Sequence, residues 1–188
     1  MNKIMKYDLY RWKGDTSFKT FISTYLFNPK YKFVYFKRKC EQNRNNKLRY
    51  ILYRMIYGRY IIKYGVDIGA KVEIGPGFIL RHLGGIAIRN EVVIGHDVEI
   101  LQGVTIGYER RGKRKGSPNI GNYVWIGSNS VIVGDIKVGN NVLIAPNTFV
   151  NFDVPDNSIV IGSPGKIIHS EDAVKGYMDN TIPFELFS

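Results

Sequence analysis

IGNYVWIGSNSVIVGDIKVGNNVLIAPNTFV, residues 120–150, carries an isoleucine or valine at every sixth position. The same six-residue period extends upstream to residue 68, with two interruptions. The aliphatic positions are Ile68, Ile74, Leu80, Ile88, Ile94, Ile100, Ile106, Ile120, Ile126, Ile132, Val138, Ile144 and Val150. A period of six fits neither an α-helix nor a simple half-buried strand, although the Val, Ile, Gly and Asn content indicates short strands and tight turns.

A triangular solenoid satisfies this period. Three six-residue segments form one coil, each aliphatic side chain points into the prism, and successive coils stack at the strand spacing of about 4.8 Å. The predicted fold is therefore mainly β, a parallel β-helix over residues 66–168. An N-terminal arm, residues 1–65, precedes it, and a C-terminal tail, residues 169–188, follows it.

The two interruptions are the places where insertions leave the wall of a solenoid. Between Leu80 and Ile88 the step is eight residues. Between Ile106 and Ile120 it is 14 residues, which is either two hexads plus two residues or one hexad with an eight-residue loop. Residues 107–119 are expected to form a loop because of their Gly, Pro and charge content.

Composition limits the class of protein. The chain has 188 residues, a formal net charge of +11 and one cysteine, Cys40, so an internal disulfide is excluded and a cytoplasmic protein is expected. The charge is uneven, because residues 1–65 hold 16 Lys and Arg against 3 acids while the remainder is slightly acidic. This distribution, and the lack of a recognised module, argue against nucleic-acid binding.

Asp67 and His82 are the candidate catalytic pair. They are 15 residues apart, which places them near the same edge of the prism on consecutive coils. A carboxylate that accepts the Nδ1 proton of an imidazole supports a general base at Nε2. The alternative is an aspartate that caps a turn beside an unrelated histidine. No pair of histidines has the spacing of metal ligands, so no metal site is expected.

Four segments carry a resemblance to a known family. They are VDI at 66–68, IGPG at 74–77, HLGGI at 82–86 and VEILQGVTIG at 98–107. Together they resemble the serine acetyltransferase branch of the hexapeptide-repeat acyltransferases. The resemblance implies a left-handed β-helix, acetyl-CoA as the acyl donor, a homotrimer with sites between adjacent subunits, and catalytic roles for Asp67 and His82. No covalent enzyme intermediate is expected.

The chain departs from the serine enzymes at two points. Arg81 stands where those enzymes usually have an aspartate before the catalytic histidine, and residues 116–118, Gly-Ser-Pro, replace Arg-His-Pro. A pocket that lacks partners for the polar groups of a substrate discriminates strongly against that substrate. With its arm and loop, the chain is similar to capsular and exopolysaccharide O-acetyltransferases. The predicted acceptor is therefore a sugar hydroxyl of a bacterial surface polysaccharide or its precursor.

The remaining candidate residues are expected to contact either the acetyl donor, coenzyme A, or the acetyl acceptor. Coenzyme contacts are expected from Gly107, Arg110, Arg111, Lys113, Ser128, Pro164 and Lys166. Acceptor contacts are expected from Arg81, Gly84, Gly85, Tyr108, Ser117 and Trp125. A basic loop is also consistent with simple solvation, and Trp125 with core or intersubunit packing.

The arm has two interpretations. Residues 16–26, 30–42 and 47–64 are expected to be helical, and the third segment carries an apolar stripe. The arm either caps the end of the solenoid or a neighbouring subunit, or it contacts anionic lipid at the inner membrane. Two alternatives to the polysaccharide enzyme also remain: a serine O-acetyltransferase, and a catalytically silent scaffold.

Overall fold

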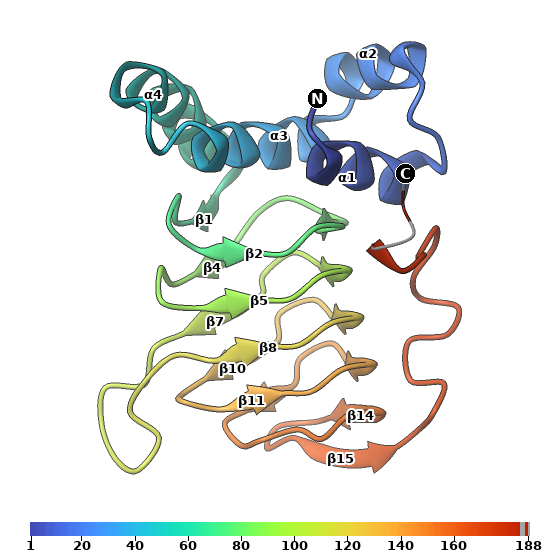
Figure 1. The fold of residues 1–188 in the computed structure, drawn as a ribbon. Helices are drawn as coiled ribbons and strands as arrows, with labels where there is room; N and C mark the ends of the chain where they lie inside the picture. The colour runs from blue at the N-terminus through green and yellow to red at the C-terminus, as the bar shows by residue number, and fades with distance from the viewer. Residues whose placement is uncertain (185–186, 188) are drawn as a thin grey trace.

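The computed structural model describes residues 1–184 and Phe187. A triangular β-helix is covered at its N-terminal end by a layer of helices, and the C-terminal tail runs back along the outside of the prism towards those helices (Figure 1). The predicted fold, a mainly β solenoid with a helical arm, is confirmed.

Three parallel sheets form the faces of the prism. The first face consists of β1 (Val66–Ile68), β4 (Ile86–Ile88), β7 (Thr105–Gly107), β10 (Val131–Val133) and β13 (Phe149–Val150). The second consists of β2 (Glu73–Ile74), β5 (Val93–Ile94), β8 (Asn119–Ile120) and β11 (Lys137–Val138). The third consists of β3 (Ile79–Leu80), β6 (Val98–Ile100), β9 (Val124–Ile126), β12 (Val142–Ile144), β14 (Ser158–Ile161) and the antiparallel β15 (Lys166–His169).

The core is a set of stacked aliphatic columns. Ile68 pairs with Ile88, Ile88 with Ile106, and Ile106 with Ile132, so the first face contributes one continuous column. All 13 aliphatic residues of the six-residue ladder are buried. Removal of this apolar surface from water is the main favourable contribution to folding.

One corner of the prism requires glycine. Gly75, Gly95, Gly121 and Gly139 follow β2, β5, β8 and β11 and lie one above another. A Cβ atom at Gly121 would lie 2.4 Å from the carbonyl oxygen of Gly139. The coils approach too closely there for any side chain, because parallel strands fix the distance between successive turns.

The register shows how each interruption is absorbed. Asp67 pairs with Ala87, Ala87 with Thr105, and Thr105 with Val131. The 20-residue interval from Asp67 to Ala87 contains the short insertion. The 26-residue interval from Thr105 to Val131 contains an eight-residue loop. Within that loop, Glu109 and Gly116 form an isolated antiparallel bridge, so residues 107–119 form a small hairpin.

Four helices make up the arm: α1 (Lys3–Lys13), α2 (Phe18–Phe27), α3 (Pro29–Gln42) and α4 (Lys47–Tyr64). The last three match the predicted helical segments to within two residues at each end. No helix in the described part of the chain has both the length and the apolar character needed to cross a bilayer.

Helix α1 was not predicted from the sequence. Its signals are nevertheless present, since the Asn2 side chain accepts a hydrogen bond from the Met5 N–H and Gly14 ends the helix in the left-handed conformation. The helix is rich in Lys and aromatic residues, and its buried apolar residues, Met5, Tyr7 and Leu9, are interspersed with charged ones. Its buried residues include Asp8 and Arg11, which are polar, so a hydrophobic pattern could not reveal it.

The arm caps the open strand edges of the first coil. Lys37 Nζ donates to the Val72 carbonyl at 2.8 Å, and the Tyr57 hydroxyl donates to the Ile68 carbonyl at 2.8 Å. Arg38 Nη1 and Nη2 donate to the Ile74 and Gly75 carbonyls, each at 2.6 Å. An uncovered strand edge presents unpaired backbone groups, so these side chains end the solenoid and prevent further strand addition. This is the capping arrangement that one interpretation of the sequence expected.

Candidate functional site

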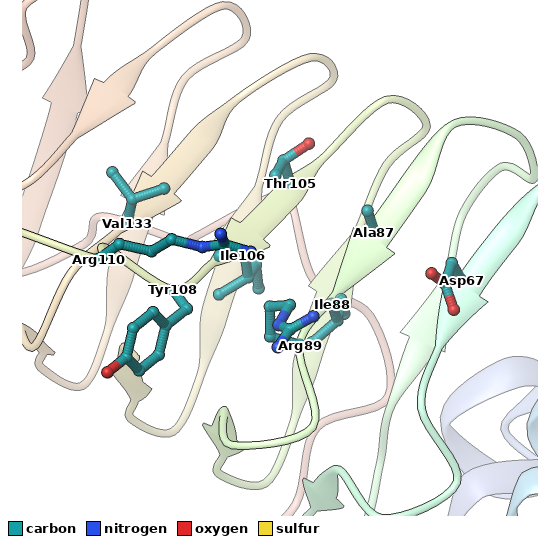
Figure 2. A pocket seen from close by; sticks show the side chains of 10 residues that line it. Asp67, Ala87, Ile88, Arg89, Thr105, Ile106, Tyr108, Arg110 and Val133 are labelled. Atoms are coloured by element: carbon teal, nitrogen blue, oxygen red, sulfur yellow. The ribbon is translucent and has the colours of Figure 1, made fainter. Parts of the chain in front are cut away.

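A cavity of about 330 Å³ opens on the first face of the β-helix (Figure 2). Its lining residues come from β1, β4, β7 and β10 and from the start of the loop: Asp67, Ala87, Ile88, Arg89, Thr105, Ile106, Gly107, Tyr108, Arg110 and Val133. Ala87 lies between Asp67 and Thr105 in the register, and Gly107 lies beside Val133. The hollow forms where these small residues interrupt rows of larger side chains.

The charged groups of the cavity have opposite signs. Asp67 lies at the end nearest the helices, while Arg89 and Arg110 lie towards the loop (Figure 2). Tyr108 is exposed and stands beside Arg110. Asp67, Gly107, Tyr108 and Arg110 were all predicted as site residues from the sequence, and the fold brings these four together. A guanidinium is the side chain best suited to phosphate and carboxylate groups.

His82 lies outside the cavity lining. It occupies the turn between β3 and β4, and its side chain is exposed. The turn is close to β1, because an added Cβ at Gly65 would lie 3.7 Å from the Gly85 N and 3.9 Å from the Gly84 Cα. Among the residues that the structure describes, no hydrogen bond joins the His82 ring to the Asp67 carboxylate. The two side chains are thus on neighbouring segments, both at the surface.

Arg81 is partly exposed, and its guanidinium is paired with a buried carboxylate. Its Nε lies 2.5 Å from Glu99 Oε2, and Nη2 lies 3.5 Å from Asp179 of the C-terminal tail. The Arg81 carbonyl accepts a hydrogen bond from Lys30 Nζ at 2.9 Å. Burial, together with the charges of Arg81 and Lys13, lowers the pKa of Lys30. The segment that leads into His82 is therefore tied to both the arm and the tail.

The other predicted residues occupy separate places. Arg111 and Lys113 are exposed in the hairpin loop, and the Ser117 hydroxyl is buried with no hydrogen-bond partner in the described chain. Trp125 lies on the third face, edge-to-face with Tyr177 of the tail at 4.8 Å between ring centroids. Ser128 is half-buried in the turn after β9, and Pro164 and Lys166 are exposed at the far end of the prism. Gly84 and Gly85 both have positive φ, at 103° and 66°.

Sequence reasoning missed a buried polar cluster where α1 meets the third face. Arg11 Nε lies 2.7 Å from Asp97 Oδ1, and Arg11 Nη2 lies 2.7 Å from Glu99 Oε1. The Tyr7 hydroxyl donates to Asp97 at 2.9 Å, and the His96 Nδ1 lies 2.8 Å from the same carboxylate. The sequence held one signal for this cluster. Tyr7 and Arg11 are four residues apart, as on one face of a helix, and Asp97 and Glu99 are two residues apart, as on one face of a strand.

His96 belongs to this cluster although it stands in a turn of the solenoid and its side chain is partly exposed. Burial raises the pKa of Asp97, and the contacts with His96, Arg11 and Tyr7 oppose that rise. Burial likewise raises the pKa of Tyr7, with a further contribution from Asp97. These groups fix α1 on the β-helix.

Comparison with known proteins identifies relatives of the repeat. The family described as "Bacterial transferase hexapeptide (six repeats)" matches residues 117–151. The chain is 37% identical over 123 residues to a serine acetyltransferase of Staphylococcus epidermidis, which covers 65% of this chain and 58% of that protein. The chain spans about a third to three fifths of the length of the curated relatives that it matches.

Solved structures give a similar result. The serine acetyltransferase of Neisseria gonorrhoeae in complex with serine matches with a TM-score of 0.70 and 28% identity, over 88% of this chain and 68% of that chain. A serine acetyltransferase in complex with CoA matches with a TM-score of 0.70 and 27% identity, over 88% of this chain and 68% of that chain.

These comparisons overturn one expectation from the sequence. A sugar hydroxyl of a surface polysaccharide was predicted as the acceptor, and that prediction is wrong, because the matched proteins and structures are named serine acetyltransferases. The stated similarity to capsular O-acetyltransferases finds no support among them. Arg81 and residues 116–118 motivated the prediction, but they do not outweigh 34–38% identity over 122–130 residues.

Proposed function

Because its β-helix is homologous to the hexapeptide-repeat domain of serine acetyltransferases, we propose that this chain transfers an acetyl group from acetyl-CoA to the hydroxyl of serine. The observation that carries the proposal is the match to the serine-bound structure, at 28% identity over 88% of the chain. The activity is that of an acyltransferase, and the match to a CoA complex supports acetyl-CoA as the donor.

The proposed chemistry uses His82 as the general base. Removal of the serine hydroxyl proton by an imidazole makes that oxygen a nucleophile towards the thioester carbonyl. Asp67 would orient the His82 ring and stabilise its charged form. Both side chains are exposed, so they are free to turn towards each other when the acceptor binds. Arg89 and Arg110 supply positive charge for the coenzyme phosphates at the cavity.

We further propose that three copies assemble, with each coenzyme site between two neighbouring prisms. The support is the open position of the cavity, which has a floor of strands and the loop hairpin on one side but lies at the outer surface of the chain. A second prism would supply the missing wall and exclude water from the thioester. Exclusion of water strengthens electrostatic interactions inside a site and limits hydrolysis of the donor.

The direct test follows release of free thiol from acetyl-CoA in the presence of serine. We expect serine-dependent release, and we expect His82→Ala to lower kcat by about a hundredfold or more, since general-base catalysis contributes 10²–10⁴-fold. His169→Ala is the matched control, because His169 is an exposed histidine on β15, away from the cavity. Its rate should equal that of the unmodified chain.

Coenzyme binding separates loss of catalysis from loss of the site. Acetyl-CoA should raise the melting temperature of His82→Ala as much as that of the unmodified protein. Thiol release that does not depend on serine, or that persists in His82→Ala, contradicts the proposal.

A further inference from the structure

Helix α4 turns its aliphatic residues to the surface. Its inward face consists mainly of tyrosines, with Tyr57 fully buried and other residues partly buried against the core: Tyr50, Tyr53, Ile56, Tyr60, Ile61 and Tyr64. Leu48, Leu52, Met55 and Ile62 lie on the opposite side, and Leu48 and Ile62 are 82% and 85% exposed. The apolar stripe that the sequence predicted is thus present, but most of it does not pack on the β-helix.

Helix α2 repeats the pattern. Phe18, Ile22 and Leu26 are spaced four residues apart and are exposed, as is Phe27, at 81%. Both helices lie at the top of the view in Figure 1, on the side of the arm away from the strands. We call this set the arm surface: Phe18, Ile22, Leu26, Phe27, Leu48, Ile51, Leu52, Met55 and Ile62, with the cations of α4, Lys47, Arg49, Arg54, Arg59 and Lys63.

The charge of the arm surface has one sign. Helix α4 carries these five cations and no acidic residue. The arm as a whole has three acids, Asp8, Asp15 and Glu41, and two of them are already paired within the arm. Asp8 contacts Arg38 at 2.8 Å, and Glu41 contacts Lys37 and Arg38. The exposed lysines and arginines therefore have little internal compensation.

We propose that the arm surface binds the surface of a membrane that contains anionic lipid. A helix that presents aliphatic and aromatic side chains between lysines and arginines inserts the apolar groups at the headgroup boundary, while the cations bind lipid phosphates. Each Lys or Arg near such a surface adds to the electrostatic attraction. A second copy of this chain would bring the same positive surface, and like charges repel, so charge complementarity favours lipid over self-association.

An acidic partner protein would complement the positive charge of the arm surface but not the way its apolar residues are distributed. Protein interfaces bury their apolar residues in a compact central patch with a polar rim. Here the apolar residues run along two helices with cations interspersed, which is the distribution that a planar headgroup layer accommodates. This inference is independent of the acceptor and does not rest on the proposed acetyl transfer.

The test is co-sedimentation of the full chain with vesicles. We expect binding to vesicles of equimolar phosphatidylcholine and phosphatidylglycerol, little binding to phosphatidylcholine alone, and weaker binding as salt is raised. Replacing two exposed side chains, Leu48→Gln with Ile62→Gln, should weaken partitioning by about tenfold, because aliphatic groups no longer enter the headgroup layer. Arg49→Glu with Arg59→Glu should abolish the preference for anionic vesicles.

Matched controls lie at the far end of the molecule. Ile167→Gln with Ile168→Gln changes two exposed aliphatic residues on β15, and Lys137→Glu reverses an exposed charge on β11. Both should bind as the unmodified chain does, and unchanged thermal unfolding shows that each variant is folded. No binding to anionic vesicles overturns the proposal, as does equal loss in test and control variants. A further outcome is that the chain self-associates without lipid and that the double variant Leu48→Gln with Ile62→Gln abolishes this association. This result would assign the arm surface to a second copy and overturn the proposal.

Discussion

The Arg11 guanidinium lies between the carboxylates of Asp97 and Glu99, and all three side chains are fully buried. Glu99 is also paired with Arg81, and Asp97 with His96 and Tyr7. The cluster links α1 to the segment that leads into His82. A buried ion pair contributes little net stability relative to apolar packing, but removal of one partner leaves an uncompensated charge.

Arg11→Met should therefore destabilise the fold by about 3 kcal/mol in chemical denaturation at neutral pH. The loss should be smaller near about pH 4. Burial raises the pKa of Asp97 in the folded state, so ionisation of Asp97 costs stability as the pH rises from its unfolded pKa through its folded pKa. Arg11 opposes that cost, and without Arg11 the folded pKa rises further.

Lys13→Met is the control, because Lys13 is exposed on the same helix. The prediction fails if the loss of unfolding free energy in Arg11→Met does not depend on pH, or if it is no larger than in Lys13→Met. Either result would mean that Arg11 does not stabilise the ionised Asp97.

At the scale of elements, two glycines differ in whether a side chain would fit. Gly121 stands in the glycine column of one corner, where a Cβ would lie 2.4 Å from a backbone oxygen. Gly58 lies within α4, where the nearest atom to an added Cβ is Arg54 Nη1 at 3.7 Å. The first position excludes a methyl group because backbone cannot give way, whereas the second has room for it.

We expect Gly121→Ala to lower the free energy of unfolding by about 1–3 kcal/mol through overpacking. Gly58→Ala should raise it by about 0.5–1 kcal/mol through helix propensity. Denaturant titration of the two variants in parallel measures both signs. Tolerance of alanine at Gly121 would mean that the corner has more freedom than the stacked coils indicate.

The tail connects the two ends of the molecule. After β15 the chain returns along the third face, where Tyr177 contacts Trp125, Asp179 approaches Arg81, and the Ile182 carbonyl accepts a hydrogen bond from the Tyr7 hydroxyl at 2.6 Å. Phe184 and Phe187 contact the Tyr7 ring. The tail thus runs along the third face of its own chain and leaves the first face uncovered (Figure 1).

At this scale we expect a solution mass near three times that of the 21.5-kDa chain by sedimentation velocity. The mass should persist on dilution to the concentrations used for activity measurements, because the proposed coenzyme site needs two prisms. A monomer that transfers acetyl groups at the full rate would show that one chain completes the site.

Residue spacing alone predicted much of this molecule. A six-residue period specifies the solenoid because every coil repeats the same local contact, and the interruptions located the turn of His82 and the hairpin loop. Asp67 was found from its spacing to His82, and Gly107, Tyr108 and Arg110 from the charged insertion loop, and all four line the cavity. Helix α1 escaped detection, because its buried residues mix the charged Asp8 and Arg11 with Met5, Tyr7 and Leu9 and so do not form a purely apolar stripe.

The sequence by itself determined the β-helix, its start near residue 66 and four of the residues that line its cavity, since local periodicity decides the coils and the insertions between them. Only the tertiary structure decided which side of α4 faces the core, where Arg81 points, and that Trp125 packs under the tail. Those outcomes depend on contacts between segments far apart in the chain: Arg11 with Glu99, Tyr57 with Ile68, and Tyr177 with Trp125. A pattern read along the chain carries no information on such partners until the fold brings them together.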